Sequence, residues 1–354
     1  MSRAATRSGI GKRPPRIADV AKLAGVSTAT VSRALTAPHR LRPDTLARVA
    51  EAVRHTGYTP NLAARTLRAR RTMLVLVVVP DIANPFFSDV LRGIDEGLSK
   101  DGYGFLIGNL GNTRANEPRL ADVALSGQVD GVLLLNGRIP TGGPRSLSPT
   151  EIPMVAICEA IPGAAIPQIE VENREAARAA VAHLASLGHR HIAYLSGPKD
   201  NILEHERRGG FCEGLKDASI PRRDARFYTG DFSFHAGVAA AEQFLRVGER
   251  PTALFAANDE MVIGFMKRIR SAGVSVPDDV SVIGFDGIEF SDFVEPTLTT
   301  FRQPRRELGY EGASLLVAAM RGDVIDPARA RQRWPVPLLT RGSTGPAPAS
   351  RDGR

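Results

Sequence analysis

Hydroxyl, methyl and guanidinium groups that could bind a nucleic acid are concentrated in the segment STATVSR, residues 27 to 33. Arginine can donate two hydrogen bonds to guanine O6 and N7, and the methyl group of alanine or threonine can contact a thymine methyl. These groups favour base contacts for Arg33, Thr28 and Ala29, and phosphate contacts for the remaining hydroxyls. A surface salt bridge is the alternative role for Arg33. The expected DNA contacts of this segment are Ser27, Thr28, Ala29, Thr30, Ser32 and Arg33.

Two short helices are expected to present this segment. In IADVAKLAGVSTATVSRAL, apolar residues recur at helical spacing on both sides of a central glycine. Ala21, Gly25 and Val31 have the spacing of a helix-turn-helix, in which the glycine supplies the positive φ of the turn. A third helix is expected over residues 44 to 56. We therefore predict an all-α helix-turn-helix DNA-binding domain over residues 16 to 58.

The positive charge of the chain lies at its N-terminal end. Residues 1 to 72 contain 15 of the 46 Lys and Arg residues but only three of the 38 Asp and Glu residues. Because phosphate contacts supply much of the affinity for DNA, this asymmetry favours a nucleic-acid-binding head over a merely solvated basic face. Residues 1 to 15 lack a periodic apolar face, and we expect them to form a disordered basic arm.

From residue 73 onward, strand and helix patterns alternate. The run MLVLVVVP is typical of a strand buried on both faces of a parallel sheet. Such patterns recur in two series, which predicts two doubly wound α/β lobes. Ligands bind beyond the carboxyl ends of the strands in sheets of this kind, so we expect a ligand cleft between the lobes.

The sequence gives little support for a membrane protein, a secreted protein or an enzyme. No apolar run approaches the roughly 18 to 20 residues that cross a bilayer, and the first residues lack a signal-peptide pattern, so we expect a cytoplasmic protein without a membrane partner. The only two cysteines, Cys158 and Cys212, fit a reducing compartment. The sequence has no glycine-rich phosphate loop or nucleophile elbow, and His189 and His191 have no cysteine or acid at ligand spacing. We expect neither an enzyme nor a cofactor or metal.

Several motifs carry a family resemblance along nearly the whole chain. IADVAKLAGVSTATVSRAL and TGYTPNLAARTLRARRT are followed by PDIANPFF, DGVLLLN, LGHRHIAYLSGP, ANDEMVIGFMKRIRSAGVSVPDDVSVIGFD, PTLTTFRQP and RGST. In this order they resemble the LacI/GalR family of transcriptional repressors. The resemblance implies a hinge helix and linker over residues 59 to 72. It also implies a periplasmic-binding-protein-like body over residues 73 to 344, which binds an effector and dimerises.

The resemblance further implies that the chain crosses between the two lobes of the body three times. The expected limits are about 73–160 and 302–331 for the N-lobe, about 161–301 and 332–344 for the C-lobe, and 345–354 for a tail. No leucine heptad occurs in the tail, so we expect a homodimer without a coiled-coil extension.

In this family, two hinge helices pair in the minor groove, and a leucine from each is wedged into the central base step. By motif match that leucine is Leu67, and we assign Asn61 and Ala64 to DNA contacts beside it. The alternative is a simple linker in which Leu67 is buried on the body.

The resemblance also implies an effector site in the cleft. Its expected residues are Phe86, Phe87, Arg207, Phe232, Asn258 and Asp286. The donors of Arg207 suit a vicinal diol, and Phe232 matches an aromatic wall. For the two neighbouring phenylalanines, stacking on ligand and packing in the core are both open. The segments PDIANPFFSDVLRGID and PMVAICEAIPG look closest to nucleoside-responsive members. We therefore hypothesise a nucleoside, with a sugar as the next choice, in which Phe87 stacks on the base while Arg207 and Asp286 hold the ribose.

These features predict a sequence-specific DNA-binding regulator, a repressor, whose affinity for its operator is controlled by a small ligand. One short recognition helix cannot select a genomic site, so we expect a homodimer on a palindromic operator of double-stranded DNA. The alternative is a solute-binding protein without a gene-regulatory role.

Overall fold

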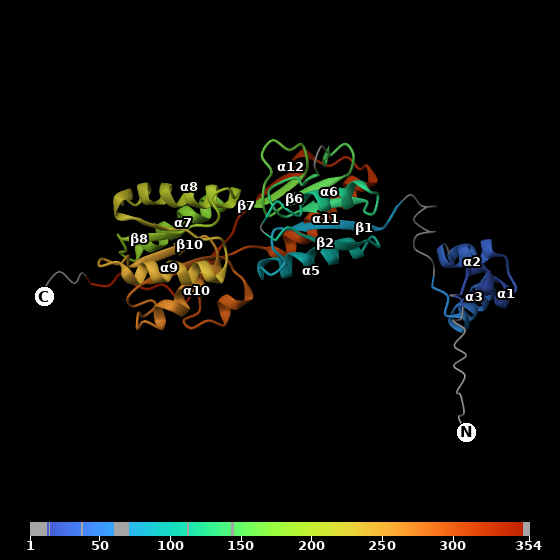
Figure 1. Ribbon diagram of the computed structural model, residues 1–354, viewed down its shortest axis with the longest axis horizontal. Coiled ribbons are helices and arrows are strands. Elements are labelled where there is room, and N and C mark those ends of the chain that lie inside the picture. Colours follow the sequence, from blue (N-terminus) through green and yellow to red (C-terminus); the bar gives the residue numbers. More distant parts are fainter. Residues whose placement is uncertain are drawn as a thin grey trace, which may run out of the picture. The chain divides into compact units, whose positions relative to one another are not determined.

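The computed structural model describes residues 13, 15–36, 38–59, 71–111, 113–142 and 145–349 (Figure 1). The chain divides into two compact units, Met1–Thr72 and Met73–Arg354. Asn61, Ala64 and Leu67 of the expected hinge helix lie outside the described residues, as does most of the expected basic arm. Within the described part of the chain, no helix is long and apolar enough to span a membrane.

The first unit is a small helical headpiece. Its elements are α1 (Ile17–Ala24), α2 (Thr28–Thr36), the 3-10 turn η1 (Pro38–Arg40) and α3 (Pro43–Thr56). Val20, Val31 and Val49 form the centre of its core. Gly25 has a φ of 63° and ends α1, and its N–H donates to the carbonyl oxygen of Ala21. This arrangement confirms the predicted helix-turn-helix.

The first lobe of the body is a parallel sheet of six strands in the order β13-β7-β6-β3-β1-β2. The strands are β1 (Leu74–Val79), β2 (Gly104–Asn109), β3 (Gly131–Leu134), β6 (Met154–Ile157), β7 (Gln168–Val171) and β13 (Arg331–Trp334). The helices are α5 (Phe86–Ser99), α6 (Glu117–Leu125), α11 (Arg305–Arg321) and α12 (Pro327–Ala330), and β4 (Thr141–Gly142) with β5 (Arg145–Ser146) forms a hairpin.

Strand β1 is buried on both faces, as its apolar run predicts. Val75 and Val77 belong to the core that includes α5 and α11, whereas Leu76 and Val78 belong to a second core with Leu120 of α6. The helices therefore cover both faces of the first sheet.

The second lobe has the sheet order β14-β12-β11-β10-β8-β9, and only the edge strand β14 is antiparallel. Its strands are β8 (Ile192–Leu195), β9 (Arg226–Tyr228), β10 (Ala253–Ala256), β11 (Ser281–Asp286), β12 (Thr299–Arg302) and β14 (Leu338–Leu339). Its helices are α7 (Asn173–Ser186), α8 (Ile202–Asp217), α9 (Phe234–Arg246) and α10 (Asp259–Arg270), with 3-10 turns η2 (Arg222–Asp224) and η3 (Glu289–Asp292). In Figure 1, α7 and α8 lie on one side of this sheet, and α9 and α10 lie on the other.

The chain crosses between the lobes three times, from β7 to α7, from β12 to α11 and from β13 to β14. The first crossing lies after Val171 rather than near residue 160, because β7 pairs with β6 in the first sheet. The third lies after Trp334 rather than residue 331, because β13 pairs with β7. The expected lobe limits were wrong at these two points, since an apolar pattern does not reveal which sheet a strand joins.

The start of the expected tail is packed on the second lobe. The N–H of Ala347 donates to the carbonyl oxygen of Leu187, and the ring of His189 lies 2.9 Å from the Thr252 hydroxyl and 3.1 Å from the carbonyl oxygen of Gly345. Burial lowers the pKa of His189. This histidine therefore has a structural role in holding the C-terminal segment.

Helix pairs in both lobes meet at glycines. A Cβ added at Gly309 of α11 would lie 2.0 Å from the carbonyl oxygen of Val90 in α5. In the second lobe, a Cβ at Gly237 of α9 would lie 2.0 Å from the carbonyl oxygen of Met261 in α10. Since the obstructing atoms belong to helix backbone, any larger residue must push the two helices apart.

We expect Gly237→Ala to destabilise the body by about 1 to 3 kcal/mol, the usual cost of overpacking. Gly248→Ala is the control, because a Cβ there meets no atom within 4 Å. Urea unfolding of the two variants beside the wild-type protein measures the difference. An unchanged midpoint for Gly237→Ala would show that the helices α9 and α10 are not in close contact.

Candidate functional site

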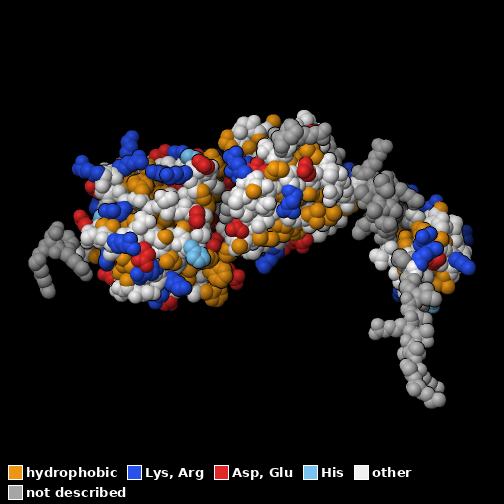
Figure 2. Space-filling model, viewed as in Figure 1, with side chains coloured by type: hydrophobic (Ala, Val, Ile, Leu, Met, Phe, Trp, Pro, Cys, Tyr) orange, Lys and Arg blue, Asp and Glu red, His pale blue; other side chains and the backbone are white. Residues whose placement is uncertain are grey.

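The DNA-binding residues expected from the sequence lie on α2 and at Ser27, directly before it. Thr28, Ala29 and Arg33 are exposed, while Val31 between them is fully buried in the headpiece core. The Ser27 hydroxyl accepts a hydrogen bond from the N–H of Thr30 at 3.1 Å, which caps the helix. Figure 2 shows Lys and Arg side chains on the visible face of this unit. The expected base-reading groups therefore share one solvent-facing surface.

A cavity of about 280 Å³ lies between the two lobes of the body. Pro80 and Cys158 reach it from the ends of β1 and β6 in the first lobe, and Asn258 and Asp286 reach it from the ends of β10 and β11 in the second. This is the carboxyl edge of both sheets, where a ligand was expected. The cavity is lined by all six expected effector residues, Phe86, Phe87, Arg207, Phe232, Asn258 and Asp286.

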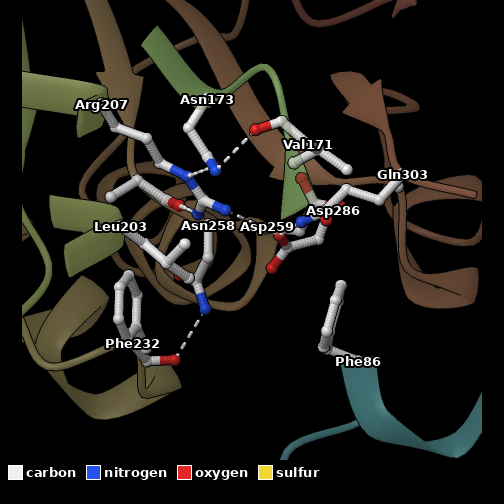
Figure 3. A network of polar contacts seen from close by, with 12 residues as sticks. Phe86, Val171, Asn173, Leu203, Arg207, Phe232, Asn258, Asp259, Asp286 and Gln303 are labelled. Carbon is white, nitrogen blue, oxygen red and sulfur yellow. Dashed lines mark hydrogen bonds and ion pairs between the residues drawn. The ribbon is translucent and has the colours of Figure 1, made fainter. Parts of the chain in front are cut away.

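The guanidinium group of Arg207 on α8 is the centre of a buried polar network (Figure 3). Only 1% of this residue is exposed. Its Nε donates to Oδ1 of Asn173 at 2.9 Å, and its Nη1 donates to the carbonyl oxygen of Ala257. The guanidinium carbon lies 3.7 Å from the centroid of the Phe285 ring. Burial lowers the pKa of Arg207, and the nearby carboxylate of Asp286 opposes that shift.

Asp286 extends the network to the first lobe. Its Oδ1 lies 3.7 Å from Nη2 of Arg207 and accepts a hydrogen bond from Nε2 of Gln303 at 2.7 Å. Burial raises the pKa of Asp286 to about 6, while Arg207 opposes the shift. Gln303 lies in the second crossing, between β12 and α11, and Asn173 follows the first. A ligand that contacts Arg207 or Asp286 would therefore act directly on residues at two of the three crossings.

Asn258 positions the aromatic wall. Its Nδ2 donates to the carbonyl oxygen of Phe232 at 2.8 Å, and its Oδ1 accepts from the N–H of Met261 and caps α10. The Phe232 ring packs over Gly197, where a Cβ would lie 2.3 Å from the ring. Glycine at this position leaves the space that the ring occupies.

The two phenylalanines at the start of α5 both line the cavity and belong to the core. Each is only 7% exposed, and the ring centroids of Phe86 and Phe87 are 5.1 Å apart in an edge-to-face arrangement. In Figure 3, the side chain of Phe86 extends from α5 toward the polar residues of the cavity. Both side chains therefore belong to the core and also border the cavity.

Backbone strain is concentrated around the cavity. Five described residues other than glycine have a positive φ, and three of them line the cavity: Cys158 at 68°, Phe232 at 72° and Asp286 at 113°. Such conformations are costly for residues with a Cβ and cluster at ligand sites. They mark this cavity as a functional site.

Two buried carboxyl groups of the cavity were not among the expected site residues. Glu159 of the first lobe accepts a hydrogen bond from Nδ2 of Asn201 at 3.2 Å, and burial raises its pKa to about 7. Glu260 of the second lobe has a pKa of about 8, raised by burial and by neighbouring carboxylates. Its Oε1 has no hydrogen-bond partner among the described residues. The position of Glu260 two residues after Asn258 was the available sequence signal.

Comparison with known proteins matches both the headpiece and the body to known families. The model of bacterial regulatory proteins of the lacI family matches residues 16–61, and the model of the periplasmic binding protein-like domain matches residues 181–344. The chain is 37% identical to the HTH-type transcriptional repressor CytR of Escherichia coli strain K12 over 330 residues, which cover 93% of this chain and 96% of that protein. It is 32% identical to catabolite control protein A of Priestia megaterium, over 88% of this chain and 94% of that protein.

Solved structures agree with this assignment. A complex of the transcriptional regulator CelR with cellobiose is 31% identical, with a TM-score of 0.69 and coverage of 93% of this chain and 99% of that one. The lac repressor dimer bound to operator and the anti-inducer ONPF is 27% identical, with a TM-score of 0.78 and coverage of 94% and 100%. The relatives are named as transcriptional regulators rather than enzymes or solute carriers. The chain belongs to the LacI family of bacterial transcriptional regulators.

Proposed function

We propose that this regulator binds a palindromic operator as a homodimer, and that a nucleoside bound between its two lobes changes its affinity for that operator. The observation that carries the proposal is the network around Arg207. In this network, Arg207 and Asp286 are hydrogen-bonded to Asn173 and Gln303, which lie at two of the three crossings between lobes. Ligand binding can therefore alter the angle between the lobes.

The chemistry of the cavity supports a nucleoside. The guanidinium of Arg207 and the carboxyl of Asp286 suit the vicinal hydroxyls of a ribose. Phe86 and Phe87 from one lobe and Phe232 from the other offer rings on which a base can stack, with Phe87 as the proposed partner. A free sugar is the second candidate. A related regulator from Enterococcus faecium, 30% identical over 77% of this chain and 99% of its own, with a TM-score of 0.70, was solved with ribose bound.

Exposed apolar side chains of the body support a homodimer. Leu106 and Ile107 are exposed on β2, the edge strand of the first sheet, and Phe290 and Phe293 are exposed in and after η3. Phe293 is 78% exposed, which is unusual for a large aromatic residue away from an interface. The lac repressor, which shares the fold, was solved as a dimer on its operator.

On the DNA side, we propose that Thr28, Ala29 and Arg33 read bases in the major groove. The hydroxyls of Ser27, Thr30 and Ser32 contact phosphates. In the minor groove, the proposed contacts are Asn61, Ala64 and Leu67. Because the operator is chromosomal DNA, the protein acts in the cytoplasm.

The first test is a titration of labelled DNA from the region upstream of the gene with the purified protein. Fluorescence anisotropy of the DNA monitors binding. We expect saturable, salt-sensitive binding, and a nucleoside that changes the operator Kd by about 5- to 150-fold. The ligand panel contains cytidine, uridine, adenosine, inosine and ribose. Equal affinity for random DNA, together with tight binding of a ligand, would instead indicate a solute-binding protein.

Arg33→Ala should weaken operator binding by about 5- to 150-fold, because one bidentate contact with guanine contributes roughly 1 to 3 kcal/mol. Binding to random DNA should change much less. Arg54→Ala is the control, since Arg54 lies on α3 in an exposed ion pair with Glu51. The same anisotropy titration measures both variants, and equal losses on operator and random DNA would exclude base reading by Arg33.

Arg207→Lys should lower ligand affinity by at least about tenfold, because lysine keeps the charge but lacks the planar set of donors. Operator binding without ligand should remain. Arg208→Lys is the matched control on the same helix, where Arg208 lies over the Phe227 ring, away from the cavity lining. Calorimetry for the ligand and anisotropy for DNA separate the two effects. Undiminished ligand affinity would remove Arg207 from the site.

A further inference from the structure

Acidic side chains dominate the charged lining of the cavity. Among the described lining residues there is one guanidinium, that of Arg207, and one histidine, His235. Five carboxyl groups face them: Asp81, Glu159, Asp231, Glu260 and Asp286. The single guanidinium is already engaged by Asn173, by the carbonyl oxygen of Ala257 and by Asp286. Little positive charge is left for a ligand.

Glu260 indicates that the ligand must supply a hydrogen-bond donor. The residue is only 6% exposed, and its Oε1 has no hydrogen-bond partner among the described residues. A buried acceptor without a donor is costly, so such a group in a cavity calls for a donor from the ligand. A hydroxyl or an amino group can provide one. A phosphate oxygen, which is an acceptor itself, cannot pair in this way with the carboxylate form of Glu260, which predominates above its pKa of about 8.

Glu159 presents a second acceptor from the opposite lobe. Its Oε2 receives a hydrogen bond from Asn201, and both residues line the cavity. The charges nearest to it are the guanidinium groups of Arg138 and Arg207. Arg138 pairs with Glu117 at 3.5 Å and does not line the cavity. Both walls of the cleft therefore present carboxyl oxygens to the ligand.

The N-termini of three helices at this cavity, which are the usual alternative for binding phosphate, already have side-chain caps. The side chains of Asn201, Ser233 and Asn258 all line it. Each accepts a hydrogen bond from N–H groups in the first turn of its own helix, respectively α8, α9 and α10. These side-chain oxygens occupy the places that phosphate oxygens would take.

We propose that the cleft selects its ligand for the absence of a phosphate group, and that Glu159 and Glu260 are specificity-determining residues for this choice. A nucleoside or sugar donates hydroxyl or amino hydrogens to them, whereas its phosphate ester brings a further negative charge and only acceptors. The inference rests on the proposed function of the cleft and narrows its ligand class to unphosphorylated compounds.

Isothermal titration calorimetry of the full-length protein tests the proposal. The probes are cytidine against cytidine 5′-monophosphate, ribose against ribose 5-phosphate, and inorganic phosphate alone. We expect the wild-type protein to bind the unphosphorylated member of a pair at least about tenfold more tightly, because like charges in a buried site repel strongly. At about pH 9, where Glu260 is ionised, Glu260→Gln should reduce this ratio severalfold. Glu249→Gln, an exposed site outside the cavity lining, should leave it unchanged.

The ratio should also depend on pH. A phosphate monoester has its second pKa near 6 and keeps its charge between about pH 7 and 9. The pKa of Glu260 is about 8, so this group ionises in that range and discrimination against the ester should increase. The acidic groups that act on Glu260 are Asp81, Asp231, Asp259 and Asp286. Asp259 has a similarly raised pKa and is present in both proteins, so the difference between wild type and Glu260→Gln reports Glu260 together with its effect on Asp259.

A phosphate ester that binds as tightly as its parent compound, or saturable binding of inorganic phosphate, would overturn the proposal. The same ratio in wild type and Glu260→Gln would overturn the role of Glu260. If no nucleoside or sugar binds while operator binding is intact, the proposed effector class is wrong, and its narrowing to unphosphorylated compounds is overturned with it. Thermal unfolding of each variant verifies that it is folded.

Discussion

The buried positive charge of the Arg207 guanidinium must be paired and hydrogen-bonded, and the structure of the second lobe depends on this constraint. A charge withdrawn from water is tolerated only where it is paired and hydrogen-bonded. Asn173 at the start of α7, the carbonyl oxygen of Ala257 after β10, and Phe285 with Asp286 at the end of β11 meet this need together. The Arg207 side chain of α8 thus fixes the ends of several elements around the cavity. The rest of the cavity surface is left for a ligand.

The same network explains how a small ligand can have a large effect. Within each lobe, helices meet at glycines such as Gly309 and Gly237, whose backbone approach leaves no room for adjustment. Such close-packed units move as rigid bodies. A change in the angle between the lobes is then concentrated at the three crossings. Asn173 and Gln303 connect two of these crossings to Arg207 and Asp286. A ligand between the lobes therefore acts where the body can bend.

The cavity also contains energetically unfavourable backbone conformations and an unpaired polar atom. Cys158, Phe232 and Asp286 adopt positive φ angles there, and Glu260 buries an acceptor without a donor. Surrounding structure must supply the free energy that these features cost. Ligand binding relieves part of the cost by supplying the missing donor, so the same features that destabilise the empty site provide affinity and selectivity.

Local sequence determined the helix-turn-helix, the buried strand β1 and the six expected cavity residues, because turn glycines, apolar periodicity and matched motifs are properties of short segments. Tertiary structure alone decided that β7 and β13 join the first sheet, since the choice of partner strand leaves no local pattern in the sequence. It also decided that Glu159 and Glu260 face one cavity from opposite lobes. Their burial and raised pKa values arise from neighbours far away in the sequence, and a glutamate by itself gives no sign of the side chains that will surround it.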